Sequence, residues 1–256
     1  MLALNEVIKQ NRDNLSEVKS FISDSDYEGS PDNYGLPPHV RHLIDQPLNE
    51  QLTYVDLLMY LQPHLNCERL KYVEIGVSVL KTFYQVASFL ENSDLYAYDI
   101  NNINPTIEKL FSKVDDSPQI KHYTHKTNNL TYFKGDVFKL EDFQSFKEEV
   151  GGKVNIIFSD AHHTGNGLQS EYENYIKDAL DKNFILYYDD LETTSMYEYF
   201  MKLSEIYKIH GGRNITPALL KVNGWLGQHE HTHLNGIITS LDLKALLPPQ
   251  IPVHYV

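Results

Sequence analysis

An apolar run that stops on an acid and two histidines constrains this chain more than any other stretch. Residues 153–163 read K-V-N-I-I-F-S-D-A-H-H and show no helical periodicity. Such a run is typical of a strand buried on both faces of a parallel sheet. Residues 184–190, F-I-L-Y-Y-D-D, end in the same way after a helical stretch. Open α/β sheets bind ligands at the carboxyl ends of their strands, so both acidic ends indicate one functional edge.

From Lys71 onward, stretches with strand and helix patterns alternate. Asn-Gly turn signals at Asn223 and Asn235 predict that residues 215–240 close the chain with a hairpin-like pair of strands. This alternation predicts an α/β fold with a Rossmann-like, doubly wound, mostly parallel sheet of seven strands. The other predicted strands are 71–75, 94–99, 130–135, 153–159 and 184–188, and the predicted helices are 80–91, 105–114, 140–150, 168–181 and 194–207.

The first 66 residues have a different organisation. Residues 2–22 and 49–65 place apolar side chains at helical spacing. Between them, residues 23–38 are rich in turn formers and read as an ordered loop or lid. We expect residues 1–66 to form a helical cap over the mouth of the main domain, which spans residues 67–256. An exposed apolar face on the first helix is a candidate surface for a homo-oligomer.

Composition excludes several classes of function. The 256 residues suffice for one large α/β domain with a full core. A net charge of −13 and the lack of a Lys/Arg block argue against a nucleic-acid partner. No apolar run approaches a membrane span, and Cys67 is the only cysteine, which fits a reducing compartment. We therefore expect a soluble, cytoplasmic protein without membrane or nucleic-acid partners.

The end of the first predicted strand has the features of a nucleotide site. Glu74 is followed by Gly76, which lets the backbone turn tightly before a helix that offers its N-terminal amides. The fingerprint G-x-G-x-x-G is absent, since Ser78 stands where a second glycine would be, so a pyrophosphate fits poorly. Asp99 ends the second strand, at the position that would bind a ribose diol. Asp136 follows the third strand and suits an adenine amine.

Over residues 68–240 the chain resembles the class I S-adenosylmethionine-dependent methyltransferases. E-I-G-x-S, the acid that ends the second strand, and G-D-V-F follow one another in the order of that family. Ordinary α/β turns are the alternative interpretation of these motifs. The resemblance implies a methionine site at Glu74, Gly76 and Ser78, with Thr82 near the methionine carboxylate, Asp99 on the ribose and Asp136 beside the adenine.

Three carboxylates follow the next two strands. Asp160 ends one strand, and Asp189 and Asp190 end the other, while neighbouring strands lie only about 5 Å apart. Such like charges repel one another unless a cation lies among them. All-oxygen ligands select a hard divalent ion, Mg²⁺ first, with Mn²⁺ or Ca²⁺ as alternatives. In the simpler interpretation, Asp189 or Asp190 caps the next helix and Asp160 is a turn residue.

His163 follows Asp160 by three residues, in D-A-H-H. That spacing resembles the metal-dependent O-methyltransferases, of the catechol, macrocin and cephalosporin hydroxylase-like types. The resemblance implies that His163 is the general base and that Asp160, Asp189 and Asp190 are the metal ligands. His162 is the rival for the base, or a residue that packs beside the cofactor.

The predicted function is therefore transfer of a methyl group from S-adenosylmethionine to a hydroxyl of a small molecule, such as a sugar, polyketide or catechol-like phenol. The divalent metal would orient and acidify the acceptor. The alternatives are a metal-independent methyltransferase and a noncatalytic adenosylmethionine-binding partner module. One further motif stays open, because His229, His231 and His233 alternate and would bind zinc, line the acceptor pocket or lie in a solvated loop.

Overall fold

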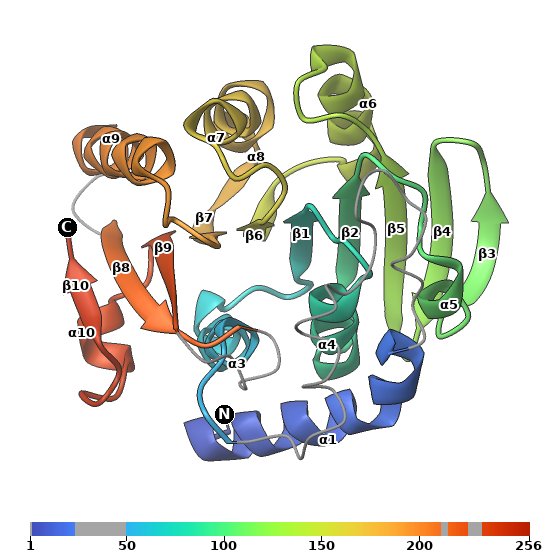
Figure 1. The fold of residues 1–256 in the computed structure, drawn as a ribbon, viewed down its shortest axis with the longest axis horizontal. Helices are drawn as coiled ribbons and strands as arrows, with labels where there is room; N and C mark the ends of the chain where they lie inside the picture. The colour runs from blue at the N-terminus through green and yellow to red at the C-terminus, as the bar shows by residue number, and fades with distance from the viewer. Residues whose placement is uncertain (1, 24–49, 211–214, 225–231) are drawn as a thin grey trace.

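The computed structural model describes residues 2–23, 50–210, 215–224 and 232–256. One mixed sheet runs through these segments, with ten strands in the order β10-β8-β9-β7-β6-β1-β2-β5-β4-β3 (Figure 1). The predicted number of seven strands is therefore wrong. The strands are β1 Lys71–Ile75, β2 Asp94–Asp99, β3 Ser112–Asp116, β4 Ile120–His125, β5 Asn128–Lys134, β6 Val154–Ser159, β7 Leu180–Tyr188, β8 Thr216–Val222, β9 His233–Thr239 and β10 Val253–Tyr255.

The centre of the sheet confirms the parallel core. Strands β5, β2, β1, β6 and β7 pair in parallel, as predicted for the first five strands of the sequence pattern. From β1 the chain moves outward through β2 and β5, whereas from β6 it moves the other way through β7. This reversal makes the β1–β6 boundary the topological switch point, where open α/β sheets leave a crevice. β8 and β9 pair antiparallel, which confirms the predicted final pair of strands, and β9 lies between β7 and β8.

The three additional strands lie toward the edges of the sheet. β3 and β4 form an antiparallel hairpin beside β5, and β10 pairs with β8. The helix predicted over residues 105–114 is wrong beyond Glu108, where α5 Pro105–Glu108 ends. Every residue of β3 is exposed, and its sequence S-K-V-D-D is largely polar. A charged edge strand protects the sheet from pairing with another chain. Because β3 has no alternating apolar pattern, its sequence does not indicate a strand.

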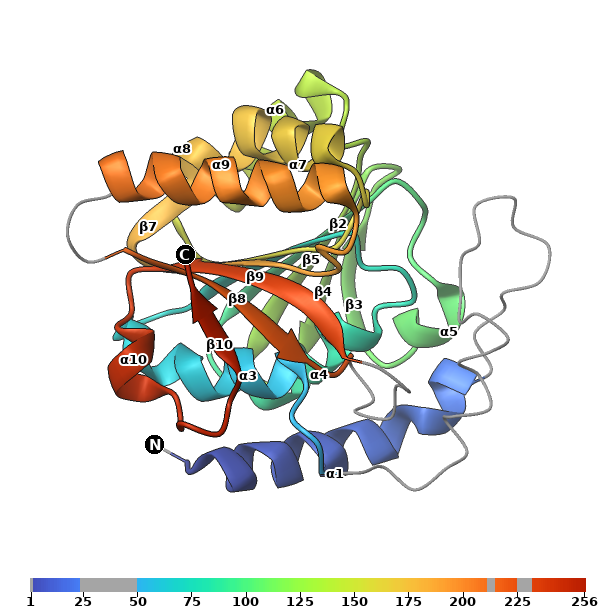
Figure 2. The ribbon, with the colours of Figure 1, turned by 60° about the vertical axis from the view of Figure 1, so that its left-hand side comes forward.

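Two helical layers cover the sheet, as the alternation of strands and helices predicts (Figures 1 and 2). Along β6, Ile156 and Phe158 point into the core with α3 and α4, whereas Ile157 joins the core on the opposite face. Apolar residues on both faces explain why this strand appears in the sequence as a continuous apolar run. The first layer contains α1 Leu4–Ser23, α3 Tyr54–Leu61 and α4 Lys81–Phe89; the second contains α6 Leu140–Val150, α7 Gly165–Glu171, the π-helix Tyr172–Ile176, α8 Lys177–Ala179 and α9 Thr194–His210.

The N-terminal helices belong to the first layer. α1 lies on the outer side of α3 and α4, and its Val7 and Leu15 join the same core as the strands (Figure 2). α3 begins with a capping box between Thr53 and Asp56 and continues into the 3₁₀ helix Gln62–Leu65. The boundary between cap and main domain near residue 66 stays a prediction, and the predicted loop at 23–38 lies almost wholly outside the described residues. Among the described helices, none combines the length and the apolar character that crossing a bilayer requires.

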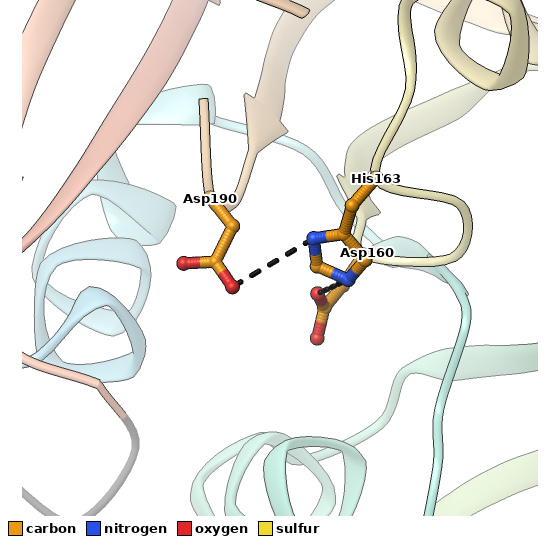
Figure 3. A group of neighbouring side chains, drawn as sticks. All are labelled: Asp160, His163 and Asp190. Carbon is orange, nitrogen blue, oxygen red and sulfur yellow. Dashed lines mark ion pairs between the residues drawn. The ribbon is translucent and has the colours of Figure 1, made fainter. Parts of the chain in front are cut away.

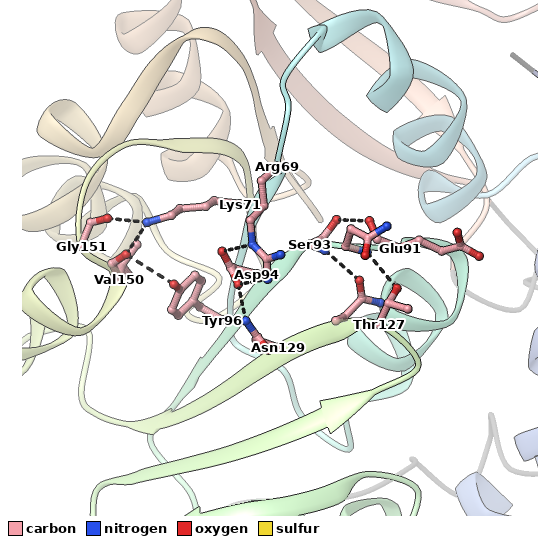
Figure 4. Close-up of polar contacts among 12 residues, drawn as sticks. Arg69, Lys71, Glu91, Ser93, Asp94, Tyr96, Thr127, Asn129, Val150 and Gly151 are labelled. Carbon is pink, nitrogen blue, oxygen red and sulfur yellow. Dashed lines mark hydrogen bonds and ion pairs between the residues drawn. The ribbon is translucent and has the colours of Figure 1, made fainter.

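Polar side chains tie the amino ends of the central strands together (Figure 4). Arg69 donates two hydrogen bonds to Asp94 at the start of β2, at 2.7 and 2.6 Å. Asn129 of β5 donates to the same carboxylate at 2.9 Å. The Arg69 guanidinium lowers the pKa of Asp94, because it stabilises the ionised form. Asp94 at this edge therefore has structural partners, and the candidate functional residues lie at the opposite, carboxyl edge of the sheet.

Candidate active site

Acidic side chains gather at the carboxyl edge of the sheet, on both sides of the switch point. On one side they come from β1, β2 and the loop after β5, and on the other side from the ends of β6 and β7. The structure therefore places the two predicted halves of the site along a single edge. The residues are Glu74, Asp99 and Asp136 on the first side and Asp160, Asp189 and Asp190 on the second.

Gly76 brings the two halves into contact. Its φ of +84° lies in the left-handed region, and its amide donates to the Tyr98 carbonyl at 2.8 Å. A Cβ at this position would lie 2.4 Å from both the Ala161 Cα and the Asp160 carbonyl oxygen. Only glycine therefore lets the loop after β1 pack directly on the loop after β6.

Asp99 holds the predicted cofactor loop in place. Its Oδ2 accepts hydrogen bonds from the amides of Val77 and Ser78 at 2.9 and 3.1 Å, and its Oδ1 accepts one from Asn101 at 2.9 Å. Burial raises the pKa of this carboxyl, and the backbone donors oppose that shift. Ser78 has a φ of +48°, so the loop bends sharply where a second glycine would stand in the dinucleotide fingerprint. The ribose contact of Asp99 stays a prediction.

Glu74 and Thr82 are both buried and bonded to tyrosines. Tyr72 donates to Glu74 Oε2 at 2.6 Å, and burial raises the pKa of Glu74 well above its usual value. Thr82 Oγ1 lies 3.1 Å from the hydroxyl of Tyr54 at the start of α3. The ring centroid of Tyr54 is 5.1 Å from that of Phe158, which places α3 directly under the site. Sequence reasoning missed Tyr54, although the T-x-x-D capping pattern before it marks where this helix begins.

Two exposed apolar side chains accompany the predicted adenosine acids. Ile100, directly after Asp99, is 59% exposed, and Phe138, two residues after Asp136, is 50% exposed. Asp136 Oδ1 accepts a hydrogen bond from the Phe138 amide at 2.9 Å. Large apolar side chains in solvent at the carboxyl edge of a sheet offer contact area to a flat ligand. The sequence analysis missed both residues, and their signal is an apolar residue placed just past an acid-ended strand.

On the β6–β7 side, two groups of possible metal-binding atoms share Asp190. Donor atoms of Asp160, His163 and Asp190 lie within 4.8 Å of one another, and so do those of Asp189, Asp190 and His233. His163 Nε2 is 3.6 Å from Asp160 Oδ1, and its Nδ1 is 3.7 Å from Asp190 Oδ2, so the ring lies between the two carboxylates (Figure 3). The three predicted carboxylates are thus divided between two groups, each of which includes a histidine.

Burial and mutual repulsion raise the pKa of two of these carboxylates. Burial raises the pKa of Asp160 to about 6, although Lys81 and His163 oppose the shift. Burial, followed by repulsion from Asp160 and Asp190, raises the pKa of Asp189 well above its usual value. A cation among these groups would relieve both the repulsion and the cost of burying charge. Their oxygen and nitrogen donors therefore fit a divalent metal ion.

The other histidines that the sequence singles out are His162, His229, His231 and His233. His162 is exposed, its Nδ1 lies 2.9 Å from Thr164 Oγ1, and its ring centroid is 5.0 Å from that of Phe138. It belongs to neither donor group found among the described residues. His233 was not predicted as a metal ligand with the carboxylates, although the H-x-H-x-H pattern marked it. His229 and His231 lie outside the described residues.

No protein-family model matches the chain, and no curated protein matches it. Among solved structures, the MycE methyltransferase of the mycinamycin biosynthetic pathway, in complex with Mg, SAH and mycinamycin VI, is similar at a TM-score of 0.46 and 15% identity, covering 92% of this chain and 57% of that chain. The O-methyltransferase TomG from Streptomyces achromogenes gives 0.49 and 10%, covering 89% and 97%. Spermidine synthase from Thermotoga maritima gives 0.45 and 12%, covering 78% and 62%. Likenesses at this distance do not assign an activity.

Proposed function

We propose that this chain is an S-adenosylmethionine-dependent O-methyltransferase that acts on a small molecule with neighbouring hydroxyls. The observation that carries the proposal is the Gly76 contact at the switch point. It joins a loop suited to a nucleoside, after β1, to a cluster of carboxylates and histidines suited to a cation, after β6. Methyl transfer requires the acceptor oxygen, the methyl carbon and the sulfur of the donor to lie in line, so the donor site and the acceptor site have to be adjacent.

The cofactor half of the proposal consists of residues in or directly after β1, β2 and β5, and of Thr82 in α4. In this proposal Glu74, Gly76 and Ser78 lie against the methionine part and Thr82 lies near its carboxylate. Asp99 holds the ribose and Asp136 lies beside the adenine. The exposed side chains of Ile100 and Phe138 support an adenosine ligand, since both offer apolar contact area beside these acids.

In the acceptor half, Asp160, Asp189 and Asp190 hold a divalent cation and His163 is the general base. When bound, adenosylmethionine supplies the methyl group and the cation supplies the positive charge that stabilises the acceptor's conjugate base. His163 accepts the hydroxyl proton at a ring nitrogen. Its side chain is 46% exposed, which leaves it accessible to an acceptor.

The overall charge supports a small acceptor. A chain of net charge −13 repels phosphate backbones and anionic membrane surfaces, so we propose neither as a partner. The single cysteine, Cys67, supports a cytoplasmic location.

A metal-independent methyltransferase is the second candidate, and the position of His163 favours it. An imidazole can accept a proton without a cation, and the His163 ring nitrogens lie 3.6 and 3.7 Å from carboxylate oxygens of Asp160 and Asp190. Removal of divalent cations distinguishes the two mechanisms.

The test is transfer of a labelled methyl group from S-adenosylmethionine to a panel of vicinal diols, sugars and catechols, with and without EDTA. We expect transfer to stop in EDTA and to return with added divalent cation. Asp160→Asn should lose this dependence together with the activity, whereas Asp115→Asn, which removes an exposed carboxylate on β3, should behave as wild type. Wild-type rates in EDTA would favour the metal-independent mechanism. Cofactor binding without transfer to any acceptor would favour a noncatalytic binding module.

A further inference from the structure

Strand β9 brings an imidazole to the acidic turn after β7. β9 begins at His233 and runs antiparallel to β7, with Gly236 opposite Tyr188. The Leu191 amide donates to the Leu234 carbonyl at 2.7 Å, which continues the pairing past the end of β7. The first residue of β9 is therefore held beside Asp189 and Asp190 by backbone hydrogen bonds.

The turn after β7 directs the Asp190 carboxylate toward the His233 imidazole. Asp190 has a φ of +51°, in the left-handed region, so the chain bends between Asp189 and Leu191. His233 Nδ1 contacts Asp190 Oδ1, while Asp190 Oδ2 faces His163. Asp189 is 5% exposed, and the side chains of His233 and Asp190 are 20% and 31% exposed, so the site is partly buried and still open to solvent at Asp190.

The donor atoms of Asp189, Asp190 and His233 lie within 4.8 Å of one another. Two carboxylates with one imidazole differ chemically from the all-carboxylate set that favours a hard cation. Mg²⁺ prefers oxygen ligands and gives up its water reluctantly. Imidazole nitrogen suits the divalent transition metals, whose affinities for mixed nitrogen and oxygen sites rise from Mn²⁺ toward Cu²⁺.

We propose that His233 is a metal ligand together with Asp189 and Asp190, and that the site therefore takes a divalent transition-metal ion of the Mn²⁺ to Zn²⁺ series in preference to Mg²⁺. This inference rests on the metal half of the proposed function and is independent of the cofactor half. It replaces the preference for Mg²⁺ that the carboxylates alone suggest.

The test is calorimetric titration of the EDTA-stripped full chain with Co²⁺ and, separately, with Mg²⁺, followed by the visible absorption of bound Co²⁺. The wild type should bind Co²⁺ at least about tenfold more tightly than Mg²⁺. His233→Asn should lower the Co²⁺ affinity at least about tenfold and change the Co²⁺ spectrum, while the Mg²⁺ affinity changes much less. His254→Asn, which removes an exposed histidine on β10, is the matched control and should change neither affinity.

A second variant keeps the test independent of how well His233→Asn folds. His233→Asp replaces the imidazole with an oxygen donor, so it should retain Mg²⁺ binding and lose most of the preference for Co²⁺. The comparison of the two ions on the wild type requires no variant at all.

Several results would overturn the proposal. Equal affinities of the wild type for Co²⁺ and Mg²⁺ would do so and leave a metal-dependent transferase standing. Equal losses for both ions in His233→Asn would show that His233 positions Asp190 without ligating the metal. Failure of both ions to bind would remove the metal half of the proposed function as well, and S-adenosylhomocysteine binding in the same samples would still test the cofactor half.

Discussion

His163 differs from the other histidines at the crevice, because its two ring nitrogens face carboxylates from two different strands (Figure 3). His162, the adjacent residue, instead contacts Thr164 and the ring of Phe138. The structure thus separates two neighbouring histidines that the sequence motif D-A-H-H leaves equivalent. This separation supports His163 as the base.

Substitution of His163 tests that role. His163→Ala should lower kcat about 10²- to 10⁴-fold, the usual contribution of a general base, and leave the affinity for S-adenosylhomocysteine unchanged. His162→Ala is the matched control and should retain most of kcat. Steady-state kinetics measures kcat of both variants, and calorimetry measures their affinity for S-adenosylhomocysteine. A large loss of kcat in His162→Ala with little loss in His163→Ala would assign the base to His162.

Glu171 is a fully buried acid that lies outside both donor groups. Its Oε2 accepts a hydrogen bond from Ser159 Oγ at 2.5 Å, beside Asp160. Burial raises its pKa from an ordinary value of 4.5 to about 8. Between these pH values the folded protein keeps a proton that the unfolded chain releases, so stability falls as pH rises from about 4.5 to 8.

The Glu171→Gln variant should therefore lose part of this pH dependence. Its unfolding free energy should fall less steeply than that of the wild type between pH 5 and 8, by up to about 1.4 kcal/mol per pH unit, the effect of one proton. Urea denaturation at several pH values measures the slope. Glu173→Gln, which changes an exposed acid in the following turn, should keep the wild-type slope; identical slopes for Glu171→Gln would contradict a raised pKa.

At the scale of elements, α1 is fixed to α3 by a buried ion pair. Arg12 donates to Asp56 at 2.8 and 3.1 Å and to the Gln51 carbonyl at 2.6 Å, and Asn11 adds a hydrogen bond to Asp56 at 2.8 Å. Asp56 also accepts a hydrogen bond from the Thr53 amide as part of the α3 capping box. The same carboxylate thus caps α3 and anchors α1.

Removal of the Arg12 guanidinium should be costly. Arg12→Leu leaves a buried carboxylate without its cation, so we expect a loss of about 3–5 kcal/mol in unfolding free energy. Lys9→Ala removes an exposed pair with Asp13 on the same helix and should lower the unfolding free energy much less than Arg12→Leu. Chemical denaturation of both variants provides the comparison; equal small losses would mean that the ion pair does not stabilise the α1–α3 contact.

The sequence predicts those elements whose apolar pattern decides their burial. β6 and residues 184–188 of β7 are buried on both faces and appear as apolar runs, and α6 and α9 show helical spacing that the structure confirms. β3 is exposed along its length and has no such pattern, and the predicted helix 105–114 extends over its first three residues. The helix predicted over 168–181 contains a π-helical turn, which follows from local hydrogen bonding that periodicity does not encode.

The sequence likewise predicts one part of the candidate site and not the other. Glu74, Asp99, Asp160, Asp189 and Asp190 were predicted at strand ends, and the structure brings these ends to one edge because the strands are parallel. Which side chains meet them could not be predicted, since the contacts of Tyr54 with Thr82 and of His233 with Asp190 join segments distant in the chain. Such contacts depend on strand order and on where α3 packs.

At the scale of the whole molecule, the two edges of the sheet differ in electrostatics. Asp94, at the amino end of β2, has Arg69 as a partner and a lowered pKa (Figure 4). Asp99, at the carboxyl end of the same strand, is buried, has backbone amides as its hydrogen-bond partners and has a raised pKa. The carboxyl end of β2 therefore holds a carboxylate whose ionised form burial destabilises, as expected where a ligand completes the structure.

Calorimetric titration with S-adenosylhomocysteine tests the account most directly, because the proposed activity requires a nucleoside site at this edge. We expect the wild type to bind in the micromolar range, with and without divalent cation. Asp99→Asn should weaken binding about 10- to 100-fold, the cost of losing a charged hydrogen-bond acceptor. Asp94→Asn, at the other end of β2, should bind as wild type. Absence of binding to the wild type, or equal binding by the Asp99→Asn variant, would contradict the account.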